Sequence, residues 1–184
     1  MQALLASTFT VAIAEIGDKT QLLALLLAAR FKNKTAIISG ILFATLLNHL
    51  AAAWLGQWAI AWVDPDVARY LVAASFFAMA LWILVPDKVE AGESRVYLWG
   101  AFMATFILFF LAEMGDKTQI ATLVLAAKYD ALAMVVAGTT LGMLLANVPV
   151  VIAGHLSADR LPLQWIHRGC ALLFAALGMA TLLW

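Results

Sequence analysis

Eight residues recur almost unchanged in this chain, and in both places they put charged side chains inside apolar sequence. AEIGDKTQ begins at Ala14, and AEMGDKTQ begins at Ala112, 98 positions later. The similarity extends beyond these motifs, because Gly40 corresponds to Gly138 at the same offset. The chain therefore consists of two related halves.

The sequence around the two motifs has the composition of a membrane protein. Of the 184 residues, 65% are hydrophobic and 12% are charged, whereas a soluble domain is about half apolar and a quarter charged. The mean hydropathy is +0.98. The formal net charge is zero, which gives no case for nucleic-acid binding, and the single cysteine has no partner for an internal disulfide.

Charged residues cluster at a few positions and leave long apolar stretches between them. Because a helix needs about 20 residues to cross a bilayer core, the stretches predict six membrane-spanning helices. Their expected bounds are 3–29, 35–62, 68–86, 97–127, 131–156 and 166–184. Four stretches are longer than a straight crossing needs and must tilt, kink or break. We expect the two motif helices to be kinked or broken, with Gly17 and Gly115 as hinges.

The lysines and arginines predict the orientation of the chain. The first, third and fifth connections carry seven of them and the opposite side carries two, so the former should face the cytoplasm and both termini the outside. Each half has three spans, an odd number, so the second half enters the membrane from the opposite side. Inverted repeats of this kind are common in secondary transporters. We expect one transmembrane domain, with repeats at 1–86 and 97–184 and a cytoplasmic linker at 87–96.

The acidic residues of the motifs are the strongest candidates for a functional site. A carboxylate in the bilayer core costs about 2.5–3.5 kcal/mol on insertion scales. The motifs supply four of them, Glu15, Asp18, Glu113 and Asp116. Residues three apart share a helix face, so each Glu and Asp should point the same way, and the two faces should meet where the halves meet. Oxygen ligands suit hard divalent cations such as Ca²⁺ and Mn²⁺.

Other polar side chains are secondary candidates for the same cation site. They are Gln21, Gln119, Thr20, Thr118, Asn48 and Asn147. An Asn within a span most often makes a hydrogen bond between helices, and this alternative stays open for the two asparagines.

Lys19 and Lys117 each follow a Glu by four residues, the favourable order for a helical ion pair. If each Lys balances one carboxylate, the ionised cluster has a net charge of −2, which matches one divalent ion or two protons. Alternatively, a Lys occupies the site when the metal leaves. In a purely structural interpretation the Glu–Lys pairs only hold helices together, but this leaves Asp18 and Asp116 without a role.

The same crowding predicts competition between metal and protons. Burial and neighbouring like charges disfavour the ionised form of a carboxylate, whereas metal binding needs that form. Such competition is the minimum requirement for an antiporter.

The two Glu-x-Gly-Asp-Lys-Thr motifs, at Glu15–Thr20 and Glu113–Thr118, resemble the signature of the calcium:cation antiporter-2 family. Its members include bacterial manganese exporters and the Golgi manganese/calcium–proton exchangers. The resemblance covers essentially the whole chain in span number and repeat layout, and the short loops look like those of a bacterial member. It implies export of Mn²⁺ from the cytosol, or movement of Ca²⁺, in exchange for protons, and it assigns the four motif carboxylates to cation binding.

We therefore expect an all-α integral protein of the inner membrane that exports Mn²⁺ by alternating access, coupled to H⁺ or Na⁺. We expect no cofactor and no enzymatic activity, and a homodimer would suit so small a bundle. Ca²⁺/H⁺ exchange by the same residues is the alternative. An intramembrane metal-dependent enzyme is the rival from another class, and the absence of a nucleophile–base pair and the symmetric duplication argue against it. A structural membrane subunit is a third interpretation.

Overall fold

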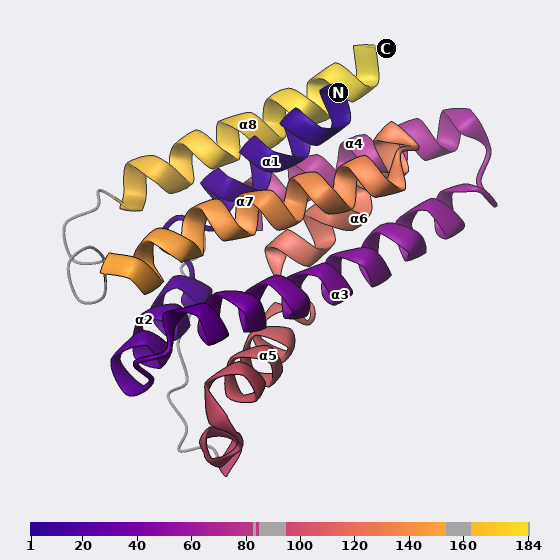
Figure 1. Ribbon diagram of the computed structural model, residues 1–184. Helices are drawn as coiled ribbons and strands as arrows, with labels where there is room; N and C mark the ends of the chain where they lie inside the picture. Colours follow the sequence, from indigo (N-terminus) through magenta and orange to yellow (C-terminus); the bar gives the residue numbers. More distant parts are fainter. Residues whose placement is uncertain (83, 85–94, 154–162, 184) are drawn as a thin grey trace.

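The computed structural model describes residues 1–82, 84, 95–153 and 163–183, and all regular structure in this part of the chain is helical (Figure 1). The described helices are α1 (Gln2–Ala14), α2 (Lys19–Arg30), α3 (Lys34–Ile60), α4 (Pro65–Trp82), the 3₁₀-helix η1 (Arg95–Trp99), α5 (Gly100–Glu113), α6 (Lys117–Tyr129), α7 (Leu132–Ala153) and α8 (Leu163–Leu183). The predicted all-α class is confirmed.

Each octapeptide motif interrupts a helix. The first motif separates α1 from α2, and the second separates α5 from α6. The φ angle is 82° at Gly17 and 73° at Gly115, in the left-handed region that residues with a Cβ disfavour. The predicted break of the motif helices is therefore confirmed, and glycine is its cause.

The other helices begin and end close to the predicted span bounds. The Asn33 side chain accepts a hydrogen bond from the Ala36 N–H at 3.1 Å and so caps the start of α3. Pro65 is the first residue of α4, where a missing N–H costs nothing. The predicted linker 87–96 lies outside the described residues except for its last two positions.

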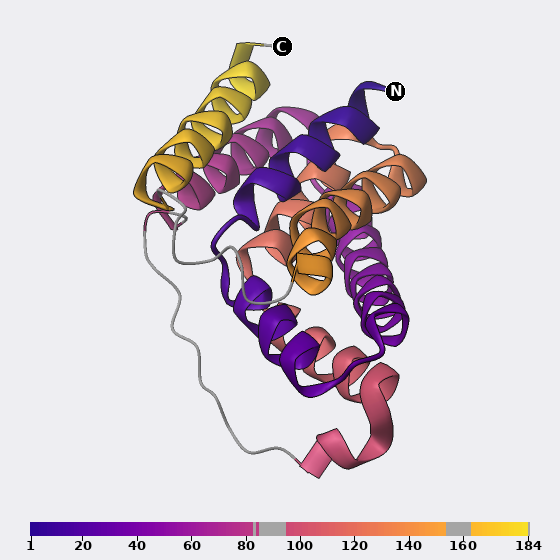
Figure 2. The same cartoon turned by 60° about the vertical axis from the view of Figure 1, so that its left-hand side comes forward.

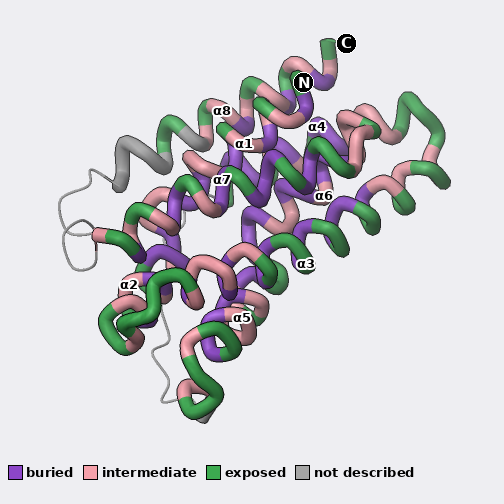
Figure 3. Tube along the Cα trace, in the orientation of Figure 1, coloured by how far each residue is buried: buried purple, intermediate pink, exposed green. Residues whose placement is uncertain are grey.

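Within the described residues, three segments are long and apolar enough to cross a membrane, namely Lys34–Ile60, Val96–Glu113 and Leu132–Ala153. The breaks leave shorter pieces, because the 13 residues of α1 extend only about 20 Å at 1.5 Å per residue, less than the bilayer core of about 30 Å. The six membrane crossings therefore stay a prediction. In this prediction, the two helices on either side of each motif, α1 with α2 and α5 with α6, together make one crossing. Exposed segments alternate with buried ones along the helices (Figure 3), and the exposed side chains include many large apolar ones.

The helices of the two halves interleave. α1 packs on α7, α3 packs on α5, α6 and α7, and α4 packs on α8 (Figures 1 and 2). Glycine makes one of these contacts close, because a Cβ on Gly142 of α7 would lie 2.6 Å from the Thr8 carbonyl oxygen of α1. Both views place the chain termini at the same end of the molecule. Interleaving brings the end of α1 and the end of α5, and hence the two motifs, into the centre.

Candidate functional site

The two motifs have the same backbone geometry. The φ and ψ angles are −78° and 166° at Asp18 and −82° and 167° at Asp116, and each Asp is the N-cap of the helix that follows. The Asp18 N–H donates to the Glu15 carbonyl oxygen at 3.1 Å, and the Asp116 N–H donates to that of Glu113 at 3.1 Å. Neither Asp side chain caps its helix, so neither carboxylate is used for that purpose.

The threonines of the motifs fix the orientation of the glutamates. The Thr20 hydroxyl donates to Glu15 Oε2 at 2.5 Å, and the Thr118 hydroxyl donates to Glu113 Oε2 at 2.7 Å. The other oxygen of each glutamate, Oε1, is buried and has no hydrogen-bond donor among the described residues. Each glutamate therefore keeps one oxygen for another partner.

Three carboxylates from the two motifs lie together. One oxygen each of Glu15, Glu113 and Asp116 lies within 4.8 Å of the others, and these residues are 0%, 0% and 3% exposed. In the part of the chain that the structure describes, the second oxygen of Asp116, Oδ2, also lacks a donor. Buried polar atoms are normally hydrogen-bonded, and a buried charge is costly unless it is paired or coordinates a metal. We call these three residues the acidic cluster.

Asp18, the fourth candidate, lies next to the acidic cluster. It is 5% exposed, and its backbone N–H is bonded to the carbonyl oxygen of Glu15, a member of the cluster. Within the described residues, its oxygens do not belong to the group of carboxylate oxygens that lie within 4.8 Å of one another.

An ion pair joins the two motifs, with Lys19 Nζ 3.2 Å from Asp116 Oδ1. The helical spacing predicts Lys19 beside Glu15 instead, and it predicts Glu15 and Asp18 on one helix face. Both predictions are wrong, because residues 15–18 are not helical and the three- and four-residue spacings lose their meaning there. Lys117, the equivalent lysine, is buried and 3% exposed.

The glutamines hold the backbone turn of each motif. The Gly17 N–H donates to Gln21 Oε1 at 2.8 Å, and the Gly115 N–H donates to Gln119 Oε1 at 2.7 Å. The amide oxygens that make these residues secondary candidates for a metal are thus engaged by the motif backbone. These contacts favour a positioning role.

The same glutamines tie each motif to the other half of the chain. Gln21 Nε2 donates to the Ala146 carbonyl oxygen of α7 at 2.9 Å, and Gln119 Nε2 donates to Asn48 Oδ1 of α3. Ala146 is the residue 98 positions after Asn48, so the two contacts are equivalent under the repeat. In the second half, the backbone carbonyl of Ala146 is the acceptor that corresponds to the Asn48 side chain. Sequence reasoning missed it, because a backbone acceptor can belong to any residue type.

The two asparagines have different surroundings. Asn48 Nδ2 donates to the Phe110 carbonyl oxygen at 2.9 Å, which links α3 to the end of α5. Among the described residues, Asn147 Nδ2 hydrogen-bonds only to Met143 of its own helix, at 3.1 Å from the carbonyl oxygen and 3.0 Å from Sδ. Its own Oδ1 has no donor. The structure therefore brings Asn48 to the second motif, and it gives Asn147 no equivalent contact.

Asn48→Ala is expected to destabilise the protein more than Asn147→Ala. The first change leaves the Gln119 amide without its acceptor and removes the bond to the Phe110 carbonyl, at a cost of about 1–3 kcal/mol. The second removes only contacts within α7, at a cost below about 1 kcal/mol. Thermal unfolding midpoints in detergent measure the difference, and equal midpoints for both variants would contradict this assignment.

The chain matches the family model described as Divalent cation/proton antiporter GDT1 over residues 3–91 and 101–184. The chain belongs to the GDT1 family. The two matched stretches begin 98 positions apart, as the two motifs do, and the resemblance to calcium:cation antiporters seen in the sequence is confirmed. The GDT1 family is one of membrane-embedded transporters and not of enzymes.

Several relatives match this GDT1 protein over nearly its whole length. A protein of Vibrio cholerae serotype O1 named "Putative manganese exporter" is 54% identical over 98% of this chain and 90% of its own. GDT1-like protein sll0615 of Synechocystis is 29% identical over 95% and 93%, and GDT1-like protein 4 of Oryza sativa subsp. indica is 27% identical over 97% and 72%. No solved structure matches the chain.

Proposed function

We propose that this GDT1 protein exports Mn²⁺ from the cytosol in exchange for H⁺, and that Glu15, Asp18, Glu113 and Asp116 bind the cation. The observation that carries this proposal is the acidic cluster, in which three buried carboxylate oxygens from both motifs lack hydrogen-bond donors. The choice of Mn²⁺ is supported by the name of the relative that is 54% identical.

The dimensions of the acidic cluster suit one divalent ion. Bonds from Ca²⁺ to oxygen are about 2.3–2.6 Å long, so two ligands of one ion lie at most about 5 Å apart. The cluster oxygens lie within 4.8 Å of one another. Carboxylates bind Mn²⁺, Ca²⁺ and Mg²⁺ in preference to softer metals, so Ca²⁺/H⁺ exchange by the same residues is the alternative.

Charge balance gives Lys19 a role in this proposal. Lys19 occupies one oxygen of Asp116 and leaves the other free for the cation. It thereby reduces the negative charge of the cluster towards that of a site for one divalent ion. We assign the equivalent role to Lys117, and the glycines at 17 and 115 act as the hinges of the motifs.

The membrane topology of the proposal has six crossings in two inverted repeats. α1 with α2 makes the first crossing and α5 with α6 the fourth, so that both broken helices meet near the bilayer midplane. The repeats span 1–86 and 97–184, with the linker 87–96 in the cytoplasm and both termini outside. The protein then resides in the inner membrane, as a monomer or a homodimer.

The two interleaved halves support alternating access as the transport mechanism. Mn²⁺ reaches the acidic cluster from the cytosol and displaces protons from the carboxylates, because the metal needs their ionised form. After the halves rearrange, protons from outside compete for the same oxygens and release the metal outward. Na⁺ in place of H⁺ is the alternative driving ion.

Transport by purified protein in liposomes tests the proposed function. With an acidic lumen, we expect external Mn²⁺ to accumulate inside, and we expect a protonophore to abolish the accumulation. Mn²⁺ accumulation driven by a Na⁺ gradient alone would show that Na⁺ is the coupling ion. Uptake of Ca²⁺ faster than that of Mn²⁺ would show that Ca²⁺ is the preferred substrate. Absence of flux for either metal, from protein that circular dichroism shows to be folded, would overturn the proposal.

A further inference from the structure

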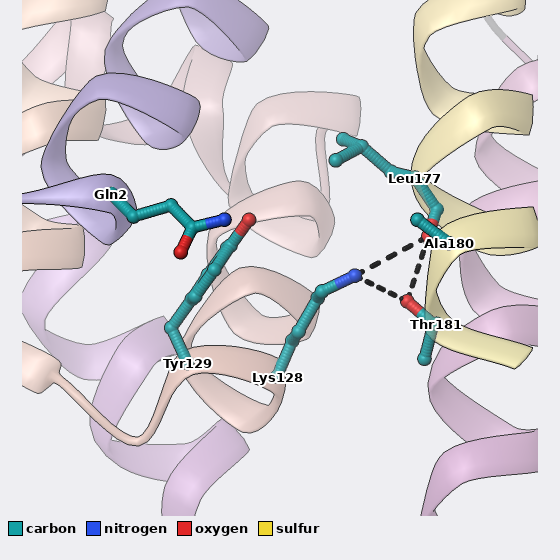
Figure 4. A pocket seen from close by; sticks show the side chains of 6 residues that line it. All are labelled: Gln2, Lys128, Tyr129, Leu177, Ala180 and Thr181. Atoms are coloured by element: carbon teal, nitrogen blue, oxygen red, sulfur yellow. Dashed lines mark hydrogen bonds between the residues drawn. The ribbon is translucent and has the colours of Figure 1, made fainter. Parts of the chain in front are cut away.

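A second polar site lies at the end of the bundle that carries both chain termini. It is a pocket of about 450 Å³ lined by Gln2, Lys128, Tyr129, Leu177, Ala180 and Thr181. Gln2 reaches it from the start of α1, and Lys128 and Tyr129 from the end of α6. The other three come from the last turns of α8, across the pocket (Figure 4).

The positively charged side chain in this pocket, Lys128, has only neutral partners within the described residues. Lys128 Nζ lies 2.6 Å from the Thr181 hydroxyl oxygen and 3.4 Å from the Leu177 carbonyl oxygen. The Thr181 hydroxyl donates in turn to the Leu177 carbonyl oxygen at 2.7 Å, so the threonine acts as an acceptor towards the lysine. No described carboxylate pairs with this half-buried lysine, unlike Lys19 in the motif.

The pocket also offers hydrogen-bond donors that are not used within the described part of the chain. The Gln2 amide and the Tyr129 hydroxyl make no hydrogen bond to the other residues that line the pocket (Figure 4). With the third N–H of the Lys128 ammonium, these groups present several donors and one positive charge. Donors around a positive charge bind a phosphate oxygen well, because hydrogen bonds between charged groups are the strong ones.

The repeat shows that this pocket is separate from the acidic cluster. Arg30 and Phe31 stand 98 positions before Lys128 and Tyr129, and the Arg30 guanidinium lies 4.3 Å above the Tyr97 ring instead. Lys128 is also eleven positions along α6 from Lys117, roughly 16 Å at 1.5 Å per residue. Lys128 therefore has partners that the equivalent Arg30 does not have, and the pocket lies away from the motifs.

The position of the pocket favours a lipid as the source of the phosphate. Lysine and tyrosine at helix ends sit at the level of the lipid headgroups. The same helix, α8, also exposes Met179 and Leu183 at 51% and 76%, an apolar surface that acyl chains can cover. We propose that this pocket binds the phosphate of an anionic phospholipid. This inference does not depend on the transported ion.

Binding of phosphatidylglycerol to delipidated full-length protein, measured by native mass spectrometry with phosphatidylcholine as reference, tests this site. We expect Lys128→Gln to weaken phosphatidylglycerol binding about five- to tenfold and Lys128→Arg to retain it. The matched control is Lys32→Gln, which removes the same charge from an exposed lysine outside the pocket and should leave binding unchanged.

Three outcomes would overturn the proposal. Equal binding by the wild type and Lys128→Gln would mean that this lysine only caps α8, and an equal loss in Lys32→Gln would mean non-specific attraction. Displacement of the lipid by millimolar inorganic phosphate would identify a free anion as the ligand. If Lys128→Gln does not fold, the double variant Gln2→Leu/Tyr129→Phe keeps the lysine and its partner, and undiminished binding in that variant would also reject the site.

Discussion

Glu113→Gln is expected to lower pH-driven Mn²⁺ flux more than about 100-fold in protein that still folds. Glutamine has the shape of glutamate, and its amide oxygen still accepts the hydrogen bond from Thr118. The free Oε1 is replaced by an amide nitrogen that repels a cation. Loss of a group that only supports a metal ligand costs about 10–100-fold, so loss of the ligand itself should cost more. Because the two motifs are equivalent, we expect the same for Glu15→Gln.

The matched control for this flux measurement is Asp66→Asn. Asp66 is 84% exposed on its side chain and lies 3.9 Å from Arg69, so the change removes one carboxylate charge far from the motifs, and flux should not change. Both variants are compared at equal amounts of reconstituted protein. Wild-type flux in Glu113→Gln and Glu15→Gln would leave the acidic cluster with a structural role only.

Gly142→Ala is expected to lower the free energy of unfolding by about 1–3 kcal/mol, the usual cost of overpacking. The new Cβ would lie 2.6 Å from the Thr8 carbonyl oxygen and 2.8 Å from the Ala12 nitrogen. Both atoms belong to the backbone of α1, so no side-chain rotation relieves the clash. α1 must shift as a whole, and Glu15 follows directly after its last residue.

Gly169→Ala in α8 is the control for this packing prediction, because a Cβ there meets nothing within 4 Å. Alanine is the better helix former by about 1 kcal/mol, so this variant should be at least as stable as the wild type. Thermal unfolding in detergent compares the two. A Gly142→Ala midpoint at or above that of Gly169→Ala would show that α1 and α7 do not approach as closely as described.

The helix positions were predictable because charge and glycine mark them. Charged residues are expensive in a bilayer, so apolar stretches outline the helices, and the predicted span 131–156 encloses all of α7. A glycine beside charged residues in such a stretch predicted the breaks. The packing of α1 on α7 and of α3 on α6 was not predictable, because α1, α3 and α7 have apolar residues on most sides.

The residues of the candidate site could be proposed from the sequence, but the contacts between them could not. Two carboxylates in each of two repeated motifs, within apolar sequence, identify a candidate site whatever the orientation of their side chains. Their relative positions depend on the φ angles of two glycines, and a helical spacing cannot anticipate these. For that reason the partner of Lys19 lies in the other motif. The hydrogen bond from Gln21 to the Ala146 carbonyl oxygen could not be predicted either, since every residue has a backbone carbonyl group.

The helix start at Asp116 bears on how long a bound ion stays. Asp116 belongs to the acidic cluster and is also the N-cap of α6. The first N–H groups of a helix have no partner within it and together carry about half a positive charge. In the proposed site, that charge would oppose a cation held by the carboxylates and would shorten its residence time. A site made of carboxylates alone would bind the cation tightly and release it slowly. A helix N-terminus at the same place would speed its release and so allow fast transport.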